Sequence, residues 1–186
     1  MSQGLIIFLG PPGAGKGTQA EKYSELKSLA HISTGVMLRD HVENETELGL
    51  IAKDILERGD LVSDNLVISM LQERLKEEDA KKGAILDGFP RTIPQAESLQ
   101  DIGNEIRISV VVVFEVPEPI LIERMLSRGR TDDTEDTIKQ RFEVYEKEVS
   151  PLISFYAGDN LIKIDGVGEE EDIYSDLRMK LEPYLI

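Results

Sequence analysis

The chain has 186 residues, with 36 acidic residues against 21 lysines and arginines, and its formal net charge is −15. Such an acidic excess disfavours nucleic acid or an anionic membrane as the main partner, because both would repel the protein. The lack of cysteine excludes disulfides and thiolate metal sites, and two histidines are too few for an all-histidine zinc site, so we expect one domain held by its hydrophobic core.

The chain opens with an apolar run from Leu5 to Leu9 that leads directly into a glycine-rich turn. Five residues are too few to cross a membrane, and their length and composition favour a buried strand. No basic, apolar and cleavable segment precedes this run. We therefore expect a cytoplasmic protein without a signal or transit segment.

The turn itself, GPPGAGKGT, has the composition of a phosphate-binding loop. Glycines let the backbone turn tightly and point its N–H groups inward, and Lys16 places an ammonium at the mouth. A helix predicted from Gln19 to Leu29 would direct its positive end at the same anion. The general motif G-x-x-x-x-G-K-[ST] is met from Gly10 to Lys16, but Gly17 takes the last place and the hydroxyl follows at Thr18. A glycine-rich turn without a ligand is the alternative, which the lysine and the flanking elements make the weaker one.

A second strand is predicted from Ala30 to Ser33, and residues of about 33–62 are predicted to form a helical insertion before the next strand. The insertion begins at the Thr34–Gly35 turn and carries Arg39. Ser63 is a suitable N-cap for the helix that follows. Because the insertion is too small to hold its own core, we expect a mobile flap over the edge of the sheet.

The segment AILD predicts a third strand that ends in Asp87, at the carboxyl edge where ligands bind in open α/β folds. This carboxylate is well placed to orient water molecules on a magnesium ion bridging phosphates, although it could instead cap the following turn. The next residues are Gly88-Phe89-Pro90-Arg91-Thr92, with Gln95 three positions after Thr92.

The stretch from Ile106 to Val116 contains four consecutive valines and predicts a strand buried on both faces. A helix is expected from about Glu118 to Ser127, with Arg124 and Arg128 four positions apart on one face. The chain then turns through residues 129–133. From spacing alone, solvated surface charges are as good an interpretation of these arginines as an anion site.

A long helix is predicted from Thr134 to Tyr156, with an apolar stripe, Arg141 just off its edge and a kink at Pro151. A last strand from Leu161 to Ile164 and a closing helix from Glu170 to Leu181 complete the chain. The alternation of short apolar strands with helices predicts an α/β fold around a parallel sheet.

Four segments, in this order, resemble motifs of the adenylate kinase family: GPPGAGKGT, HISTGVMLR, DGFPRT with Gln95, and RMLSRGRTDD. The resemblance implies a P-loop nucleoside triphosphate hydrolase-like three-layer fold with a five-stranded parallel sheet. It further implies a single kinase domain over residues 1–186, a helical NMP-binding flap at about 33–62 and a short lid at about 127–136, without zinc. Val36 departs from the family, which often has aspartate there. In the family the Phe89–Pro90 bond is often cis.

The resemblance also implies a role for each candidate site residue. ATP would be bound by the loop, the lid and the last turn, through Gly13, Ala14, Gly15, Lys16, Gly17, Thr18, Arg124, Arg128 and Gly168. AMP would be bound by Thr34, Gly35, Arg39, Asp60, Leu61, Val62, Gly88, Phe89, Pro90, Arg91, Gln95, Arg130 and Arg141. The catalytic set would be Lys16, Arg91, Arg128, Arg130 and Arg141, with Asp87 contacting magnesium through water. Asp132 and Asp133 would either orient the lid arginines or cap the next helix.

The implied activity is adenylate kinase: reversible, magnesium-dependent phosphoryl transfer from ATP to AMP, giving two ADP, for adenine nucleotide balance and salvage. The expected partners are these nucleotides alone, and the expected state is a monomer. A uridylate or cytidylate kinase on the same fold is the neighbouring alternative. A nucleotide-gated switch of the GTPase kind would need a base-reading motif such as N-K-x-D, which the sequence lacks.

Overall fold

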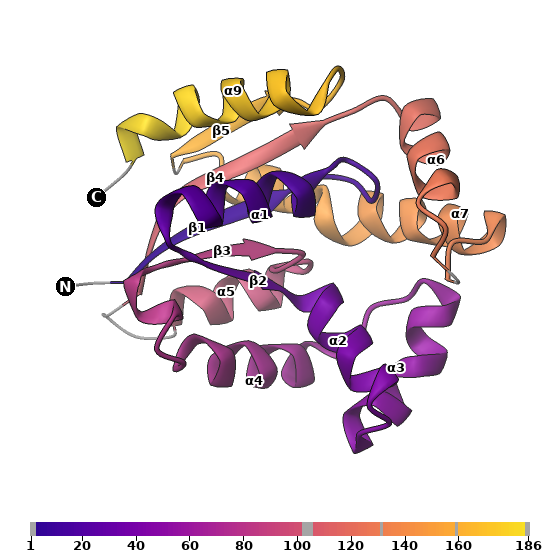
Figure 1. Ribbon diagram of the computed structural model, residues 1–186. Helices are drawn as coiled ribbons and strands as arrows, with labels where there is room; N and C mark the ends of the chain where they lie inside the picture. The colour runs from indigo at the N-terminus through magenta and orange to yellow at the C-terminus, as the bar shows by residue number, and fades with distance from the viewer. Residues whose placement is uncertain (1–2, 102–105, 131, 159, 185–186) are drawn as a thin grey trace.

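The computed structural model describes residues 3–101, 106–130, 132–158 and 160–184. Within them, a parallel sheet of five strands has the order β2-β3-β1-β4-β5 (Figure 1). The strands are β1 Gln3–Leu9, β2 Ala30–Ser33, β3 Ala84–Asp87, β4 Ile106–Glu115 and β5 Leu161–Asp165. The predicted α/β class and five-stranded parallel sheet are therefore confirmed.

The helices pack on both faces of the sheet and make the fold three-layered (Figure 1). Their bounds are α1 Lys16–Lys27, α2 Thr34–Glu43, α3 Glu47–Arg58, α4 Asp64–Leu75, α5 Ile93–Asp101, α6 Glu118–Ser127, α7 Glu135–Val144, α8 Pro151–Phe155 and α9 Glu170–Leu181. Short 3₁₀ turns occupy Ala80–Lys82 and Glu182–Tyr184. One hydrophobic cluster joins the sheet to α4, α5 and α8, and a second joins it to α1 and α9.

Burial on both faces explains why the valine-rich strand lies inside the sheet. The four valines of β4 at positions 110–113 are almost fully buried, as are Ile7 and Phe8 of the neighbouring β1. β-branched side chains suit this position because they pack well on a pleated surface covered from both sides. β1, which leads into the loop, and β4, which precedes α6 and the lid, are therefore interior strands with a neighbouring strand on each side.

The segment predicted as one kinked helix, 134–156, differs from that prediction. The structure has α7, then a π-helical turn at Tyr145–Val149, and then α8 beginning at Pro151. Proline has no N–H to continue the helix, and the Ser150 N–H instead reaches back to the Tyr145 carbonyl oxygen at 2.8 Å. The irregularity thus begins six residues before the proline, and it places Tyr145 and Val149 on the wall of the main cleft.

The order of the strands brings the flap and the lid together. β1, β3 and β4 run parallel, so the segments that follow their carboxyl ends meet at one edge of the sheet (Figure 1). At that edge lie the flap helices α2 and α3, the loop before α1 and the connection from α6 to α7. The candidate site is expected at this edge.

Candidate active site

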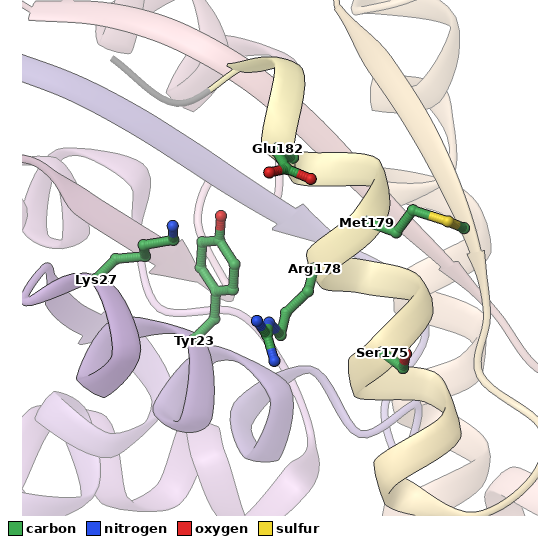
Figure 2. Close-up of a pocket in the computed structure, with 6 residues that line it drawn as sticks. All are labelled: Tyr23, Lys27, Ser175, Arg178, Met179 and Glu182. Carbon is green, nitrogen blue, oxygen red and sulfur yellow. The ribbon is translucent and has the colours of Figure 1, made fainter.

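Two cavities differ sharply in what lines them. A cavity of about 320 Å³ between α1 and α9 is lined by Tyr23, Lys27, Ser175, Arg178, Met179 and Glu182 (Figure 2). None of these residues belongs to a sequence motif. A larger cleft of about 720 Å³ opens at the carboxyl edge of the sheet and gathers residues from all four motifs.

Most of the predicted site residues line this larger cleft. They are Gly13, Ala14, Gly15, Lys16, Gly17, Thr18, Gly35, Arg39, Asp60, Leu61, Asp87, Gly88, Pro90, Arg91, Arg124, Arg128, Arg130 and Arg141. Thr34, Val62, Phe89, Gln95 and Gly168 are not among the lining residues. The roles of both groups toward nucleotides stay predictions.

The phosphate loop connects β1 to α1 in a conformation that glycine makes possible. Gly13 and Gly15 have positive φ angles of 84° and 86°. A Cβ atom at Gly13 would lie 2.9 Å from the carbonyl oxygen of Leu121, so only glycine fits there. Helix α1 begins at Lys16, three residues earlier than predicted, and Gly15 takes the N-cap position. The N-terminal end of α1 therefore opens directly onto the loop.

The Lys16 side chain is held inside this loop by backbone oxygens. Its Nζ donates hydrogen bonds of 2.8 Å to the carbonyl oxygens of Gly10 and Pro11. Burial, opposed by the carboxylate of Asp87 and reinforced by the charges of Arg91 and Arg128, lowers the pKa of Lys16 to about 8. An anion beside this ammonium would raise its pKa again, because an opposite charge favours the protonated form.

Asp87 ends β3 opposite Lys16, beside His31 of β2. The nearest His31 nitrogen lies 3.7 Å from the carboxylate. Burial acts to raise the pKa of Asp87, but the adjacent His31 ring and the Lys16 charge outweigh it, and the pKa lies below the usual value. Asp87 is therefore an anion at neutral pH. His31 was not singled out by the sequence, since only the register of β2 with β3 brings it there.

Arginines from four segments converge on the same cleft. Arg39 comes from α2, Arg91 from the turn after β3, and Arg128 and Arg130 from the lid, while Arg141 projects from α7. Burial is the main cause that lowers the pKa values of Arg39, Arg91 and Arg130, and the neighbouring positive charges lower them further. Desolvated cations in a chain of net charge −15 indicate a site for a multiply charged anion.

Asp132 and Asp133, between the lid arginines and α7, are paired with Arg128 of the lid and Arg141 of α7. Asp133, whose side chain is 1% exposed, accepts from Arg128 Nη2 at 2.8 Å and from Arg141 Nη1 at 2.5 Å, and Asp132 pairs with Arg141. Burial acts to raise the pKa of Asp133, but the Arg128 hydrogen bond and the surrounding arginines outweigh it and lower the pKa. The cap of α7 is Thr134, which accepts from the Thr137 N–H at 3.2 Å. Asp132 and Asp133 were expected either to orient the arginines or to cap the next helix. The observed contacts agree with the first of these two roles.

The far end of the flap is attached to α7. Thr137 Oγ1 donates to the carbonyl oxygen of Glu57 at 3.1 Å, and Gln140 Nε2 donates to Asp60 Oδ1 at 2.9 Å. Gly59 ends α3 with a positive φ of 80°. These bonds join the flap to the helix that carries Arg141, so the two segments border a single cleft.

Two of the residues expected to bind AMP, Thr34 and Gln95, are bonded to the protein itself. Thr34 Oγ1 donates to the Gly88 carbonyl oxygen at 2.7 Å, and the N-cap position of α2 is taken by Ser33. Gln95 Oε1 accepts from the Arg91 N–H at 2.7 Å, and its Nε2 donates to Asp64 at 2.8 Å. The Phe89–Pro90 bond between these residues is cis. Asp64 was missed by the sequence interpretation, because no motif marks it.

The residues at the loop suit magnesium only in company with a polyphosphate. Within the described residues, no group of three or more histidine or acidic side chains is gathered to hold a metal ion. Asp87 is a single ionised carboxylate beside the phosphate loop. Mg²⁺ in kinase sites is bound through one or two carboxylates, water and substrate phosphates, so this donor set fits that ion.

A phosphate loop facing converging arginines over one cleft defines a phosphoryl-transfer enzyme of the nucleotide kinase class. A family model described as adenylate kinase matches residues 8–161. A protein named adenylate kinase from Prochlorococcus marinus (strain MIT 9301) is 47% identical over 179 residues, covering 95% of this chain and 97% of the relative. Another of that name, from Mycolicibacterium vanbaalenii, is 46% identical over 172 residues, covering 91% and 94%.

The chain therefore belongs to the adenylate kinase family. This confirms the predicted family and the predicted class of enzyme, a nucleoside monophosphate kinase. In the described part of the chain, no helix combines the length and the apolarity needed to cross a membrane.

Proposed function

We propose that this member of the adenylate kinase family transfers the terminal phosphoryl group of ATP to AMP, reversibly, with two ADP as products. The observation that carries the proposal is the single cleft in which Lys16 of the phosphate loop faces arginines from both the flap and the lid. The phosphate loop alone would be sufficient to bind the phosphates of one nucleotide. The additional arginines of the flap and the lid provide positive charge for the phosphate of a second nucleotide.

Phosphoryl transfer needs little covalent chemistry from the protein. It requires that the two reactants are aligned and that the negative charge on the phosphate oxygens is neutralised. In this proposal, Lys16 and Arg128 bind the donor phosphates and Arg124 lies against the donor base. Arg39 and Arg91 hold the acceptor phosphate, while Arg130 and Arg141 close over the group in transfer. No general base is needed, because the attacking phosphate oxygen is already an anion.

The proposed enzyme works with magnesium, with the flap and the lid as its moving segments, and in the cytoplasm. Magnesium, oriented by Asp87 through water, supplies further neutralisation of the phosphate oxygens when bound. The whole chain acts as one kinase domain, with the NMP-binding flap at about 33–62 and the short lid at about 127–136, of which Thr131 lies outside the described residues. We place the enzyme in the cytoplasm as a monomer that balances adenine nucleotides.

A coupled assay with AMP, CMP and UMP at equal concentration tests the choice of acceptor. We expect AMP to be preferred, and Gln95→Ala to lower kcat/KM for AMP by about 5- to 150-fold with ATP binding little changed, because polar groups on adenine would lose their partner. Thr34→Ala should cost less with AMP and raise the relative activity with CMP or UMP. A wild type that prefers CMP or UMP would replace this proposal with the pyrimidine alternative.

A further inference from the structure

Asp64 begins α4, directly after the flap, and its carboxylate contacts two buried side chains of the segment that follows the cis Phe89–Pro90 bond. Its Oδ1 accepts from Thr92 Oγ1 at 3.0 Å and from Gln95 Nε2 at 2.8 Å. Thr92 is 8% exposed and Gln95 is 2% exposed. Asp64 is therefore the contact between the end of the flap and the residue proposed to read the acceptor base.

The partners of Gln95 allow its amide only one orientation. The Arg91 backbone N–H can only donate, and it bonds to Oε1 at 2.7 Å. A carboxylate can only accept, and it bonds to Nε2. Turning the amide over would set its NH₂ against the Arg91 N–H and its oxygen against the Asp64 carboxylate. Both contacts would then be repulsive in a buried place where the groups have few other partners.

A fixed amide offers a base a fixed order of hydrogen-bonding groups. Gln95 has two amide hydrogens and two oxygen lone pairs, and the contacts to Asp64 and Arg91 use one of each. One N–H and one lone pair remain, with their order set. Adenine presents an amine donor beside a ring-nitrogen acceptor, whereas hypoxanthine, a purine of the same shape, presents an oxygen acceptor beside a ring N–H donor. An amide that could turn over would serve either base.

We propose that Asp64 is a positioning residue that locks the Gln95 amide in one orientation and thereby makes the acceptor site take AMP and reject IMP. This inference rests on the proposed reading of the acceptor base by Gln95. In the present structure Gln95 is nearly covered, so a base that contacts it must displace part of that cover. The bonds to Asp64 and Arg91 keep the amide oriented when that happens.

The test measures kcat and KM for AMP and for IMP, at saturating magnesium-ATP, in the full-length enzyme. For Asp64→Ala we expect KM for AMP to rise about tenfold and the ratio of kcat/KM for IMP to that for AMP to rise by a similar factor. KM for ATP should stay within about twofold. Asp64→Asn keeps an acceptor oxygen and should recover most of the selectivity for AMP. If the alanine variant does not fold, Asp64→Leu fills more of the space, also has no acceptor, and should give the same rise in the IMP/AMP ratio.

Two controls separate positioning from a general loss of stability. Asp172→Ala also removes an acidic residue from the first turn of a helix, but an exposed one in α9, and it should leave both KM for AMP and the IMP/AMP ratio unchanged. In a Gln95→Ala background, the further change Asp64→Ala should have almost no effect on the ratio, because the amide through which Asp64 acts is gone.

The outcomes distinguish this inference from the proposed function. Equal losses with AMP and IMP in Asp64→Ala, or effects of Asp64→Ala and Gln95→Ala that simply multiply, would overturn the inference while AMP remains the acceptor. A wild type that prefers a pyrimidine monophosphate over AMP would overturn the proposed function whatever Asp64 does. An IMP/AMP ratio that rises only when Gln95 is present would support the inference.

Discussion

The phosphate loop and the lid hold their positive charges in opposite ways. Lys16 is bonded to the backbone carbonyl oxygens of its own loop, while Arg128 and Arg141 are bonded to the side-chain carboxylate of Asp133. Backbone oxygens cannot leave without unfolding the loop. A side-chain carboxylate can be exchanged for another anion, and carboxylate and phosphate both match the planar donors of arginine.

This difference indicates that the phosphate loop and the lid have different functions in anion binding. The loop is built for its anion in advance, as electrostatic catalysis requires. Arg128 and Arg141 are instead held by carboxylates, and we expect the phosphates of a bound nucleotide to replace these. The predictions below test this contrast, beginning with the loop.

Replacing Lys16 should have the largest effect on activity. We expect Lys16→Met to lower kcat/KM by a factor on the order of 10² or more, about 3 kcal/mol, because the ammonium stabilises charge that develops in the transition state. Circular dichroism and thermal unfolding should change little. The matched control is Lys27→Met, which removes a lysine from the last turn of the same helix, outside the cleft, and should retain activity. Near-normal activity of a folded Lys16→Met enzyme would contradict the role given to the loop.

Replacing Asp133 should reduce stability more than loop changes do. Asp133→Asn leaves Arg128 and Arg141 without the anion between them, and we expect the free energy of unfolding to fall by about 1–3 kcal/mol. ATP should then raise the Tm of this variant more than that of the wild type, because the phosphates supply the missing negative charge. Thermal unfolding with and without magnesium-ATP measures both effects.

The control for Asp133 is Glu135→Gln, which changes an exposed acidic residue at the start of α7 and should behave as the wild type. Equal ATP-induced shifts in the wild type and in Asp133→Asn would show that the carboxylate is not exchanged for phosphate.

Local sequence patterns were sufficient to predict most of this fold. The helices at Glu118–Ser127 and Glu170–Leu181 begin and end as predicted, because apolar periodicity and the residues around each end agree. The loop was recognised because its glycines and lysine are consecutive. A motif whose residues are neighbours in the chain can be interpreted without knowing the tertiary structure.

What the sequence did not reveal depends on contacts between distant segments. Asp64 meets Gln95 across 31 positions, and His31 meets Asp87 only through strand pairing. The π-helical turn at Tyr145–Val149 has no signal beyond the proline that follows it. For Asp132 and Asp133 the sequence allowed two roles, because spacing alone does not show whether a carboxylate contacts an arginine or the end of a helix.

Exchange of amide hydrogens should separate the two regions by their response to ligands. We expect a molecule that joins two adenosines through five phosphates to slow exchange in the flap and the lid at least about tenfold more than ATP alone, because only two bound nucleotides would contact the arginines of both segments. The amides of β1 and β4 should be protected alike in every state. If ATP alone protected the flap as well, a switch gated by one nucleotide would be the better model.

The smallest expected effect concerns the pH dependence of ATP binding. Without nucleotide, burial and the charges of Arg91 and Arg128 lower the pKa of Lys16 to about 8, despite the opposing effect of Asp87. Bound phosphates favour the charged ammonium and raise this pKa, so ATP binding takes up a proton above about pH 8. Affinity should therefore be almost constant below about pH 7 and fall as pH rises through 8, with a dissociation constant about three- to fivefold larger at pH 9 than at pH 8 if the complex has a pKa of about 9 or more.

Calorimetry at pH 8 in two buffers with different heats of ionisation measures this proton uptake directly. The Lys16→Met variant has no group to titrate there, so its apparent binding enthalpy should not depend on the buffer beyond any contribution from ATP itself. Binding by the wild type that is equally tight at pH 8 and pH 9, with no buffer dependence, would mean that the lysine keeps its proton without the nucleotide. The backbone oxygens of Gly10 and Pro11 would then be sufficient to hold a charged ammonium in the loop, and the loop would be preorganised in charge as well as in shape.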